Sequence, residues 1–195
     1  PSALWVNCDG NRFSNEDVAF SFAQAANAIY AQPHHYSWSI FDDSQVQYMM
    51  EKGVDSGIGV LVPVGQKLPN LQKEIDEAVA VKSDGFKAAD SVAQLAKELG
   101  VPEANLQKAV DQYNKACEVG HDSEYYKEKT YLRPLNTKKL YAIKLKAYFF
   151  SSYGGLNTNR KHQVLDKNNK PIKGLYATGL EVSDMVGPTY STWSS

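Results

Sequence analysis

Strand-like segments stand at both ends of this chain, and helix-like segments fill its middle. Near the start, residues 4–13 predict a strand, an Asp-Gly-Asn turn and a return strand, because Asp-Gly between apolar residues favours a tight hairpin. Near the end, apolar residues recur at every second position from 141 to 149, which is the period of a half-buried strand. This order indicates an α+β fold in which the middle of the chain is inserted into a sheet-containing domain.

The middle of the chain is predicted to hold a strand at 36–41 and several amphipathic helices. Two of the helices begin with the spacing of a capping box, Ser44 with Gln47 and Ser91 with Gln94. Gly100 lies where a glycine commonly ends a helix. The apolar stripes and these end signals place the helices at 20–30, 44–52, 74–81, 91–99 and 102–119.

The chain after residue 160 predicts further strands. Val164 and Leu165 are separated from Ile172 by a polar connection that suits a hairpin. Residues 174–179 are interpreted as a short buried strand that runs into a glycine turn. We expect the strands within 4–13 and 140–180 to pair with each other, because each would otherwise leave an open sheet edge.

Composition narrows the class of protein and of partner. Of the 195 residues, 43% are hydrophobic and 22% are charged, which is typical of a globular domain with one good core or two small ones. The 21 Lys and Arg residues nearly cancel the 22 Asp and Glu residues, so no basic excess attracts nucleic acid. No apolar run approaches the roughly 18 residues that a membrane-spanning helix needs. We therefore expect neither a nucleic-acid partner nor a membrane span in this segment.

Metal and disulfide chemistry are not indicated either. Cys8 and Cys117 stand far apart and form no CxxC pair, so we expect two inert thiols. His34 and His35 are adjacent, and neighbouring side chains do not converge on one ion, so they are interpreted as solvated loop residues. The chain opens without Met and closes at Trp-Ser-Ser, which suggests a fragment of a longer protein.

Four motifs occur in the order found in one enzyme family. They are DGNRFSNE at 9–16, a segment of the form NL…YN…G from 105 to 120, SYGGL at 152–156 and KGLYATG at 173–179. Together they resemble elements of the FAD-dependent reductase family that includes soluble fumarate reductases, urocanate reductase and 3-ketosteroid dehydrogenases. The resemblance spans nearly the whole chain, and no single motif would carry it alone.

The resemblance implies a division into three segments and a cofactor. Residues 1–21 and 140–195 would belong to a flavin-binding domain, and 22–139 would form a mixed, largely helical substrate-capping domain inserted between them. Gly154 and Gly155 would approach the flavin ring, and Gly179, with Glu181 just beyond it, the ribityl-pyrophosphate region. Glycine suits both places because a residue without Cβ lets backbone N–H groups come close to a ring or phosphate. The alternative is that these glycines only form turns.

The resemblance also implies where the cofactor is mostly held. The dinucleotide fingerprint GxGxxG is absent: Gly57 and Gly59 have no third glycine and precede a strand instead of following one. FAD is therefore expected in the full-length parent, with the fingerprint upstream of residue 1. We expect this chain alone to hold no FAD and to be inactive.

Departures from the family pattern argue against fumarate as the substrate. Fumarate reductases of the family use cationic side chains, because two carboxylates must be neutralised and a proton delivered to carbon. Here the position of a substrate-binding His falls on Ser151, and that of an Arg after the GLYATG segment falls on Tyr190. In the family, a segment of the cap leads to a further arginine. Residues 41–44 of this chain resemble that segment, but residues 45–47 contain no Arg.

Hydroxyl groups take the place of these cations and suggest catalytic candidates. Tyr153, Tyr190 and Ser151 suit a neutral or weakly polar substrate, since a phenol near the flavin could donate a proton or polarise a carbonyl. The alternative for the tyrosines is aromatic packing. Glu16 is a candidate for a proton path, or else a surface carboxylate near a helix start.

Two hypotheses for function follow from these residues. The first is a fragment of an FAD-dependent oxidoreductase that moves hydride between flavin and a C=C or CH–CH substrate other than fumarate, with a small molecule bound beneath the cap. The second is a non-catalytic module whose tyrosines and tryptophans form a ligand or protein contact surface.

Overall fold

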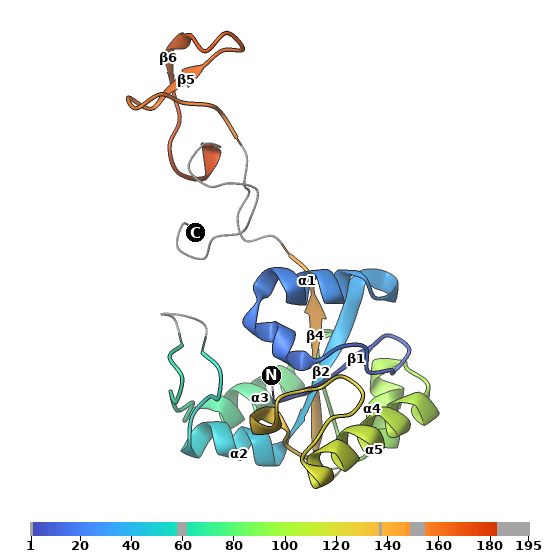
Figure 1. Cartoon of the computed structure of the whole chain (residues 1–195). Coiled ribbons are helices and arrows are strands. Elements are labelled where there is room, and N and C mark those ends of the chain that lie inside the picture. The colour runs from blue at the N-terminus through green and yellow to red at the C-terminus, as the bar shows by residue number, and fades with distance from the viewer. Residues whose placement is uncertain (1, 58–61, 137, 149–154, 183–195) are drawn as a thin grey trace. The chain divides into compact units, whose positions relative to one another are not determined.

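The computed structural model describes residues 2–57, 62–136, 138–148 and 155–182, and divides into two compact units, Pro1–Ala147 and Tyr148–Ser195 (Figure 1). The first unit holds four strands: β1 Leu4–Asn7, β2 Tyr36–Asp42, β3 Phe86–Ala89 and β4 Leu140–Lys146. Its α-helices are α1 Phe22–Tyr30, α2 Asp43–Glu51, α3 Leu71–Ala80, α4 Val92–Leu99 and α5 Glu103–Val119. Short 3₁₀ turns are η1 Glu16–Phe20, η2 Pro33–His35 and η3 Lys129–Tyr131.

The four strands form one antiparallel sheet in the order β1-β2-β4-β3. β2 lies between β1 and β4, with Leu4 opposite Ile40 on one side and Ala142 opposite Ile40 on the other. The predicted direct pairing of the two ends of the chain is therefore wrong among the described residues. The ends do share one sheet, but a strand from the middle of the chain joins them.

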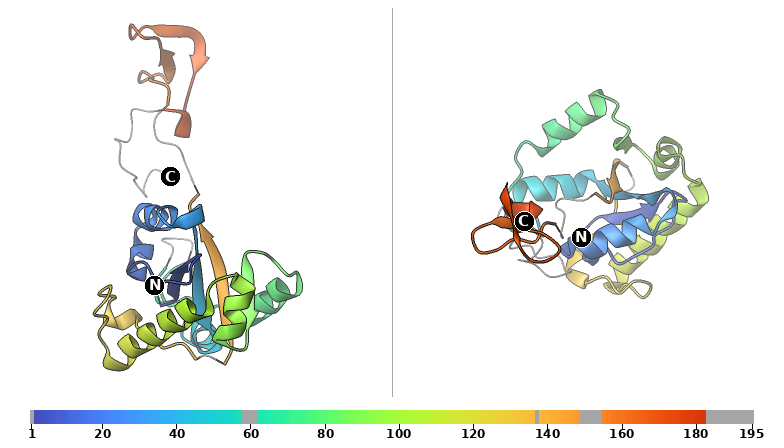
Figure 2. Two further views of the ribbon diagram at one scale, coloured as in Figure 1. Left: turned by 90° about the vertical axis from the view of Figure 1, so that its right-hand side faces the viewer. Right: turned by 90° about the horizontal axis from the view of Figure 1, so that it is seen from above.

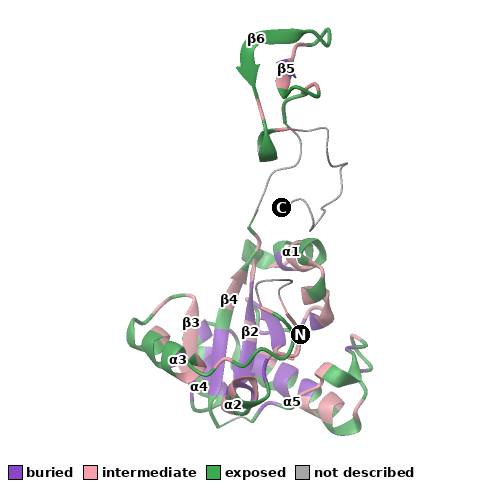
Figure 3. Ribbon diagram, turned by 90° about the vertical axis from the view of Figure 1, so that its left-hand side faces the viewer, coloured by how far each residue is buried: buried purple, intermediate pink, exposed green. Residues whose placement is uncertain are grey.

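Helices cover both faces of this sheet, so the first unit has three layers (Figure 2). On one face α4 and α5 enclose the larger core cluster, in which alternate strand residues such as Leu4, Ile40 and Leu140 are buried. On the other face α2 and α3 enclose a smaller cluster around Phe41 and Tyr141. Buried residues accordingly concentrate on the strands and on the helix sides that face them (Figure 3).

Local sequence signals explain where most of these helices begin and end. Ser91 caps α4 by accepting a hydrogen bond from the backbone N–H of Gln94, and Gly100 ends the helix with φ +70°. Both were predicted from sequence. At α2 the predicted cap Ser44 is wrong: Asp42 accepts the hydrogen bond from the backbone N–H of Gln45, so the cap lies two residues earlier than expected.

The predicted alternation of burial along β4 is only partly correct. Leu140, Tyr141 and Ala142 are all buried, because helices cover both faces of the sheet at this end. Ile143, expected inside, has 40% of its surface exposed. The alternation therefore predicts the strand but not the extent of the layers above it.

The second unit contains a two-stranded sheet, β5 Gln163–Leu165 with β6 Pro171–Tyr176, followed by the 3₁₀ turn η4 Gly179–Glu181. The predicted hairpin is confirmed. The prediction that residues 174–179 form a buried strand is wrong, since every residue of β6 is exposed. Among the described residues of this unit only Val164 of β5 is buried, so the short hairpin gives β6 little to pack against.

Candidate functional site

Glu16 lies in a fully buried cluster of charged side chains in the first unit. Its carboxylate accepts hydrogen bonds from Arg12 Nε at 2.9 Å and Arg12 Nη2 at 2.8 Å, and forms an ion pair with Lys127 Nζ at 3.2 Å. The backbone N–H of Trp5 also donates to it. Glu16 is at a helix start, as expected, but it has 0% of its surface exposed, so the alternative of a surface carboxylate is wrong.

Asp122 is the second acid of this buried charge cluster. Its Oδ2 accepts a hydrogen bond from Arg12 Nη2 at 2.7 Å and from the backbone N–H of Lys127 at 3.2 Å, and its Oδ1 caps the turn that follows. Burial acts to raise the pKa of Asp122, but the Arg12 hydrogen bond and the backbone N–H groups outweigh it and lower that pKa. Asp122 is thus held as a carboxylate.

The two cations of the cluster are enclosed by aromatic rings. Arg12 lies 5.4 Å from the ring centroid of Tyr113 and 4.8 Å from that of Tyr125, and Lys127 Nζ lies 4.7 Å from the Tyr113 ring. Burial lowers the pKa of Lys127, and its ion pair with Glu16 opposes that shift. Two cations and two anions therefore balance, and the cluster ties the start of the unit to a turn 110 residues later.

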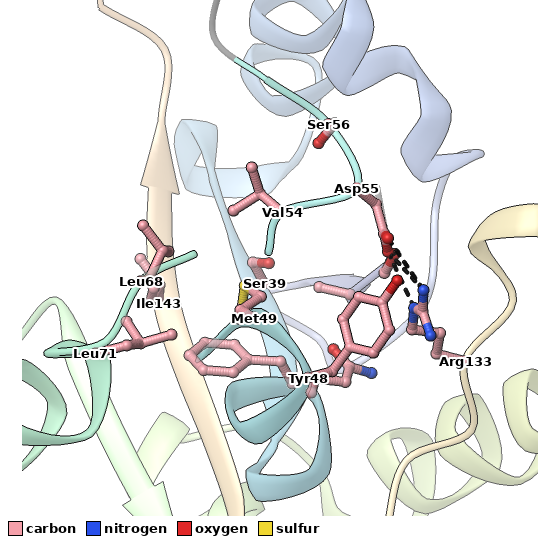
Figure 4. Close-up of a pocket in the computed structure, with 14 residues that line it drawn as sticks. Ser39, Tyr48, Met49, Val54, Asp55, Ser56, Leu68, Leu71, Arg133 and Ile143 are labelled. Carbon is pink, nitrogen blue, oxygen red and sulfur yellow. Dashed lines mark hydrogen bonds and ion pairs between the residues drawn. The ribbon is translucent and has the colours of Figure 1, made fainter. Parts of the chain in front are cut away.

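The α2 face of the sheet carries a hollow of about 320 Å³, which we call the α2 pocket (Figure 4). Sheet residues Ser39, Phe41 and Ile143 form its floor. The other lining residues are Ser2, Ala3, Gln45, Tyr48, Met49, Val54, Asp55, Ser56, Leu68, Leu71 and Arg133. Arg133 binds Asp55 through two hydrogen bonds of 3.0 and 3.1 Å and lies 3.8 Å from the centroid of the Tyr48 ring. Sequence reasoning missed this pocket.

In the second unit, the described cofactor candidates lie close together. A Cβ built on Gly155 would lie 2.4 Å from the carbonyl oxygen of Glu181, and the next residue, Leu156, donates its backbone N–H to that oxygen at 2.8 Å. Gly179 has φ +67° with open space around it. A hollow of about 290 Å³ lies nearby, lined by His162, Tyr176, Ala177 and Thr178.

Comparison with known proteins decides the family. The model of a family described as "FAD binding domain" matches residues 1–193. This chain belongs to that FAD-binding domain family. A vinyl phenol reductase from Lactiplantibacillus plantarum is 34% identical over 187 residues, which is 96% of this chain and 38% of the relative, so the chain spans well under half of that protein.

Two solved structures share the fold of this FAD-binding family member. The open conformation of a flavocytochrome c3 fumarate reductase aligns with 93% of this chain and 27% of its own, at 29% identity and a TM-score of 0.65. A 3-ketosteroid delta1-dehydrogenase from Sterolibacterium denitrificans, in complex with 1,4-androstadiene-3,17-dione, aligns with 94% of this chain and 33% of its own, at 25% identity and a TM-score of 0.62. The resemblance inferred from the four motifs is thereby confirmed.

Some of the predicted site residues lie within the described part of the chain and others do not. Ser151, Tyr153, Gly154 and Tyr190 lie outside the described residues, so their roles stay predictions. Gly155 has a reason to be glycine within its own unit, since a side chain would collide with the Glu181 carbonyl. Gly179 is exposed and nothing occupies the space of a Cβ there, so the structure gives no packing reason for glycine, and its contact with FAD stays a prediction.

Metal-binding clusters and membrane-spanning helices are both absent from the described part of the chain. No group of three or more His, Cys, Asp and Glu side chains there could hold a metal ion. Among the helices that the structure describes, none has the length and apolar character to cross a membrane.

Proposed function

We propose that this chain is part of an FAD-dependent oxidoreductase that moves hydride between flavin and a C=C or CH–CH substrate other than fumarate. The observation that carries the proposal is the 34% identity, over 96% of the chain, to a vinyl phenol reductase. Vinyl phenols are uncharged at neutral pH, because the pKa of a phenol is about 10. An uncharged substrate suits the hydroxyl groups that this chain has at positions where fumarate reductases of the family share cationic residues.

The chain's segments take complementary roles in this proposal. Residues 22–139 form a cap over the substrate, and residues 148–195 form part of the flavin-binding domain. Residues 1–21 and 140–147 also belong to the flavin-binding domain in this proposal, and their strands β1 and β4 flank the cap strand β2 in one sheet. The chain spans 38% of its reductase relative, which leaves ample length for the remainder of a flavin domain in the parent protein.

Backbone groups of the second unit would face the cofactor. When bound, FAD supplies the hydride chemistry. Gly179 presents an exposed backbone at a positive φ, and Gly154 and Gly155 belong to the turn assigned to the flavin ring. Gly155 also keeps residue 156 within hydrogen-bond distance of the Glu181 carbonyl, which links the two predicted contact segments.

Hydroxyl groups would position the substrate and deliver the proton. In this proposal Tyr153, Tyr190 and Ser151 supply hydroxyl groups that donate hydrogen bonds or a proton to the reacting substrate, and Glu16 belongs to a proton path. A dicarboxylate would lose the charge-assisted hydrogen bonds of the missing cations, at roughly 1.5–3 kcal/mol each. Two such losses weaken its binding by about two to four powers of ten.

The decisive experiment compares substrates in the full-length parent protein. With a chemically reduced viologen dye as electron donor, we expect turnover of 4-vinylphenol and negligible turnover of fumarate. Efficient fumarate turnover would overturn the assignment of Ser151 and Tyr190 to the cationic positions.

Tyrosine variants of the parent test the hydroxyl roles. Tyr153→Phe and Tyr190→Phe should each lower kcat by about 10²-fold or more with flavin retained, because general acid catalysis is typically worth that much. Tyr30→Phe in α1 is the control, since Tyr30 is exposed and stacks on His35. Unchanged turnover in both test variants would reduce these tyrosines to packing.

A further inference from the structure

We propose that the α2 pocket binds a small, uncharged aromatic molecule with one hydrogen-bond acceptor. We further infer that in the parent protein it receives the apolar part of the substrate, a step that rests on the function proposed above. The first statement concerns this chain alone and needs no flavin. Four observations carry it: the size of the pocket, its apolar walls, its balanced charge and one unpartnered amide.

The size of the α2 pocket fits a substituted aromatic ring. Its volume is about 320 Å³, at the lower end of the roughly 300–1,000 Å³ typical of ligand sites. A dry apolar cavity of about 150 Å³ already holds benzene, so the α2 pocket leaves space for a ring with a short side chain. Most of its walls are apolar, from Ala3, Phe41, Met49, Val54, Leu68, Leu71 and Ile143.

The charge of the α2 pocket is balanced before any ligand enters. Arg133 is the only cation among its lining residues and Asp55 the only anion, and the two are joined by paired hydrogen bonds. Ser2 Oγ donates a further hydrogen bond to Asp55 at 2.9 Å, and Tyr48 covers the guanidinium. A carboxylate ligand would have to displace Asp55 or be repelled by it. An uncharged ligand meets neither cost.

Gln45 supplies one of the polar groups that line the α2 pocket. It lines the α2 pocket with only 6% of its surface exposed, and its Nε2 has no hydrogen-bond partner among the described residues. A buried donor without a partner costs about 1–3 kcal/mol. This Nε2 is shut off from solvent, so the Gln45 side chain would have to turn towards the ligand, where an acceptor such as a phenol or ether oxygen would satisfy it. The pocket then selects for an aromatic molecule that carries one.

The test is a titration of the purified 195-residue chain, followed by NMR of labelled methyl groups. The probes are 4-ethylphenol and the similarly sized carboxylate 4-hydroxybenzoate. We expect saturable shifts at Met49, Leu71 and Ile143 with 4-ethylphenol, and at least tenfold weaker binding of 4-hydroxybenzoate. No saturable shift with 4-ethylphenol, or equal affinity for both probes, would overturn the proposal.

Two variants test the reasons behind the selectivity. Gln45→Met removes the amide at similar length and should weaken 4-ethylphenol binding about three- to tenfold, the worth of one neutral hydrogen bond. Asp55→Asn frees the charge of Arg133 and should shift the preference towards 4-hydroxybenzoate. Gln107→Met, on the exposed side of α5, is the matched control and should change neither. An unchanged ratio of affinities in Asp55→Asn would refute the charge argument.

The link to the substrate is tested separately in the full-length parent. There Gln45→Met should raise KM for 4-vinylphenol about three- to tenfold with flavin content unchanged. If the chain binds 4-ethylphenol but KM does not move, the pocket is a ligand site apart from the substrate, and the second inference fails. If the parent shows no flavin-dependent activity, the proposed function fails while the binding result stands.

Discussion

Replacing Asp122 with asparagine removes one charge from the buried cluster with little change of shape. In the native protein the charges of Arg12 and Lys127 are balanced by Glu16 and Asp122. The amide side chain of the variant would keep an oxygen for the backbone N–H groups of the turn, but one cationic charge would stay buried without its partner. The substitution therefore separates the ion pair from the cap that Asp122 also forms.

The magnitude follows from how completely the pair is buried. The side chains of Arg12 and Asp122 are 5% and 2% exposed, so water cannot replace the lost partner. Breaking a buried ion pair by removing one member costs about 3–5 kcal/mol. The control is Glu118→Gln, because the Lys115–Glu118 pair on α5 is as short, at 2.7 Å, but lies on the surface. We expect the control to leave the unfolding midpoint unchanged.

Urea unfolding followed by tryptophan fluorescence measures the difference, since Trp5 and Trp38 lie in the first unit. The pKa of Asp122 is lowered in the folded state, so its contribution is present above its unfolded pKa of about 3.9 and is lost as pH falls through the folded value. The gap between wild type and Asp122→Asn should therefore narrow below about pH 4. A loss under about 1 kcal/mol at pH 7 would refute the reasoning.

Three further predictions address other parts of the chain. Gly155→Ala would place a Cβ 2.4 Å from the carbonyl oxygen of Glu181; amide hydrogen exchange at Leu156 should accelerate, and unchanged protection would argue against this close approach. Ser91→Ala removes the side-chain cap on the backbone N–H of Gln94 and should lower the free energy of unfolding by about 1 kcal/mol in urea, whereas no change would show that the cap is replaced by water. The purified chain should be colourless, because no dinucleotide fingerprint occurs in it; a flavin absorbance band at near one FAD per chain would defeat this prediction.

Helices with their own end signals could be predicted from the sequence. The Ser91 cap, the Gly100 end and the stripe of α4 act over a few neighbouring residues, and the structure reproduces them. The predicted cap of α2 was wrong because both Asp42 and Ser44 are good capping residues. Asp42 prevails because it is the last residue of β2, and its Oδ2 also accepts a hydrogen bond from the backbone N–H of Asn136, 94 residues away. That distant contact is invisible in a local pattern.

Strand partners could not be predicted in the same way. The sequence patterns identify β1, β2 and β4 as strands, but they do not say which strand neighbours which. Because β1 and β4 would each leave an open edge, we expected them to pair with each other. In the structure β2 lies between them and pairs with one edge of each. The buried charge cluster could not be predicted for the same reason. Arg12 and Glu16 are four residues apart in one motif, but Asp122 and Lys127 come from a distant turn.

Ile143 was predicted to be buried, but it is partly exposed and lines the α2 pocket. On the α4 and α5 face, the apolar strand positions Leu4, Ile40 and Leu140 are covered by helices. On the opposite face, Tyr141 is covered, but Ile143, two residues further along β4, lines the pocket with 40% of its surface exposed. An apolar residue on the core-facing side of a strand is exposed where the helix layer above it stops. The proposed apolar ligand would remove this surface from water, which is a favourable contribution to its binding.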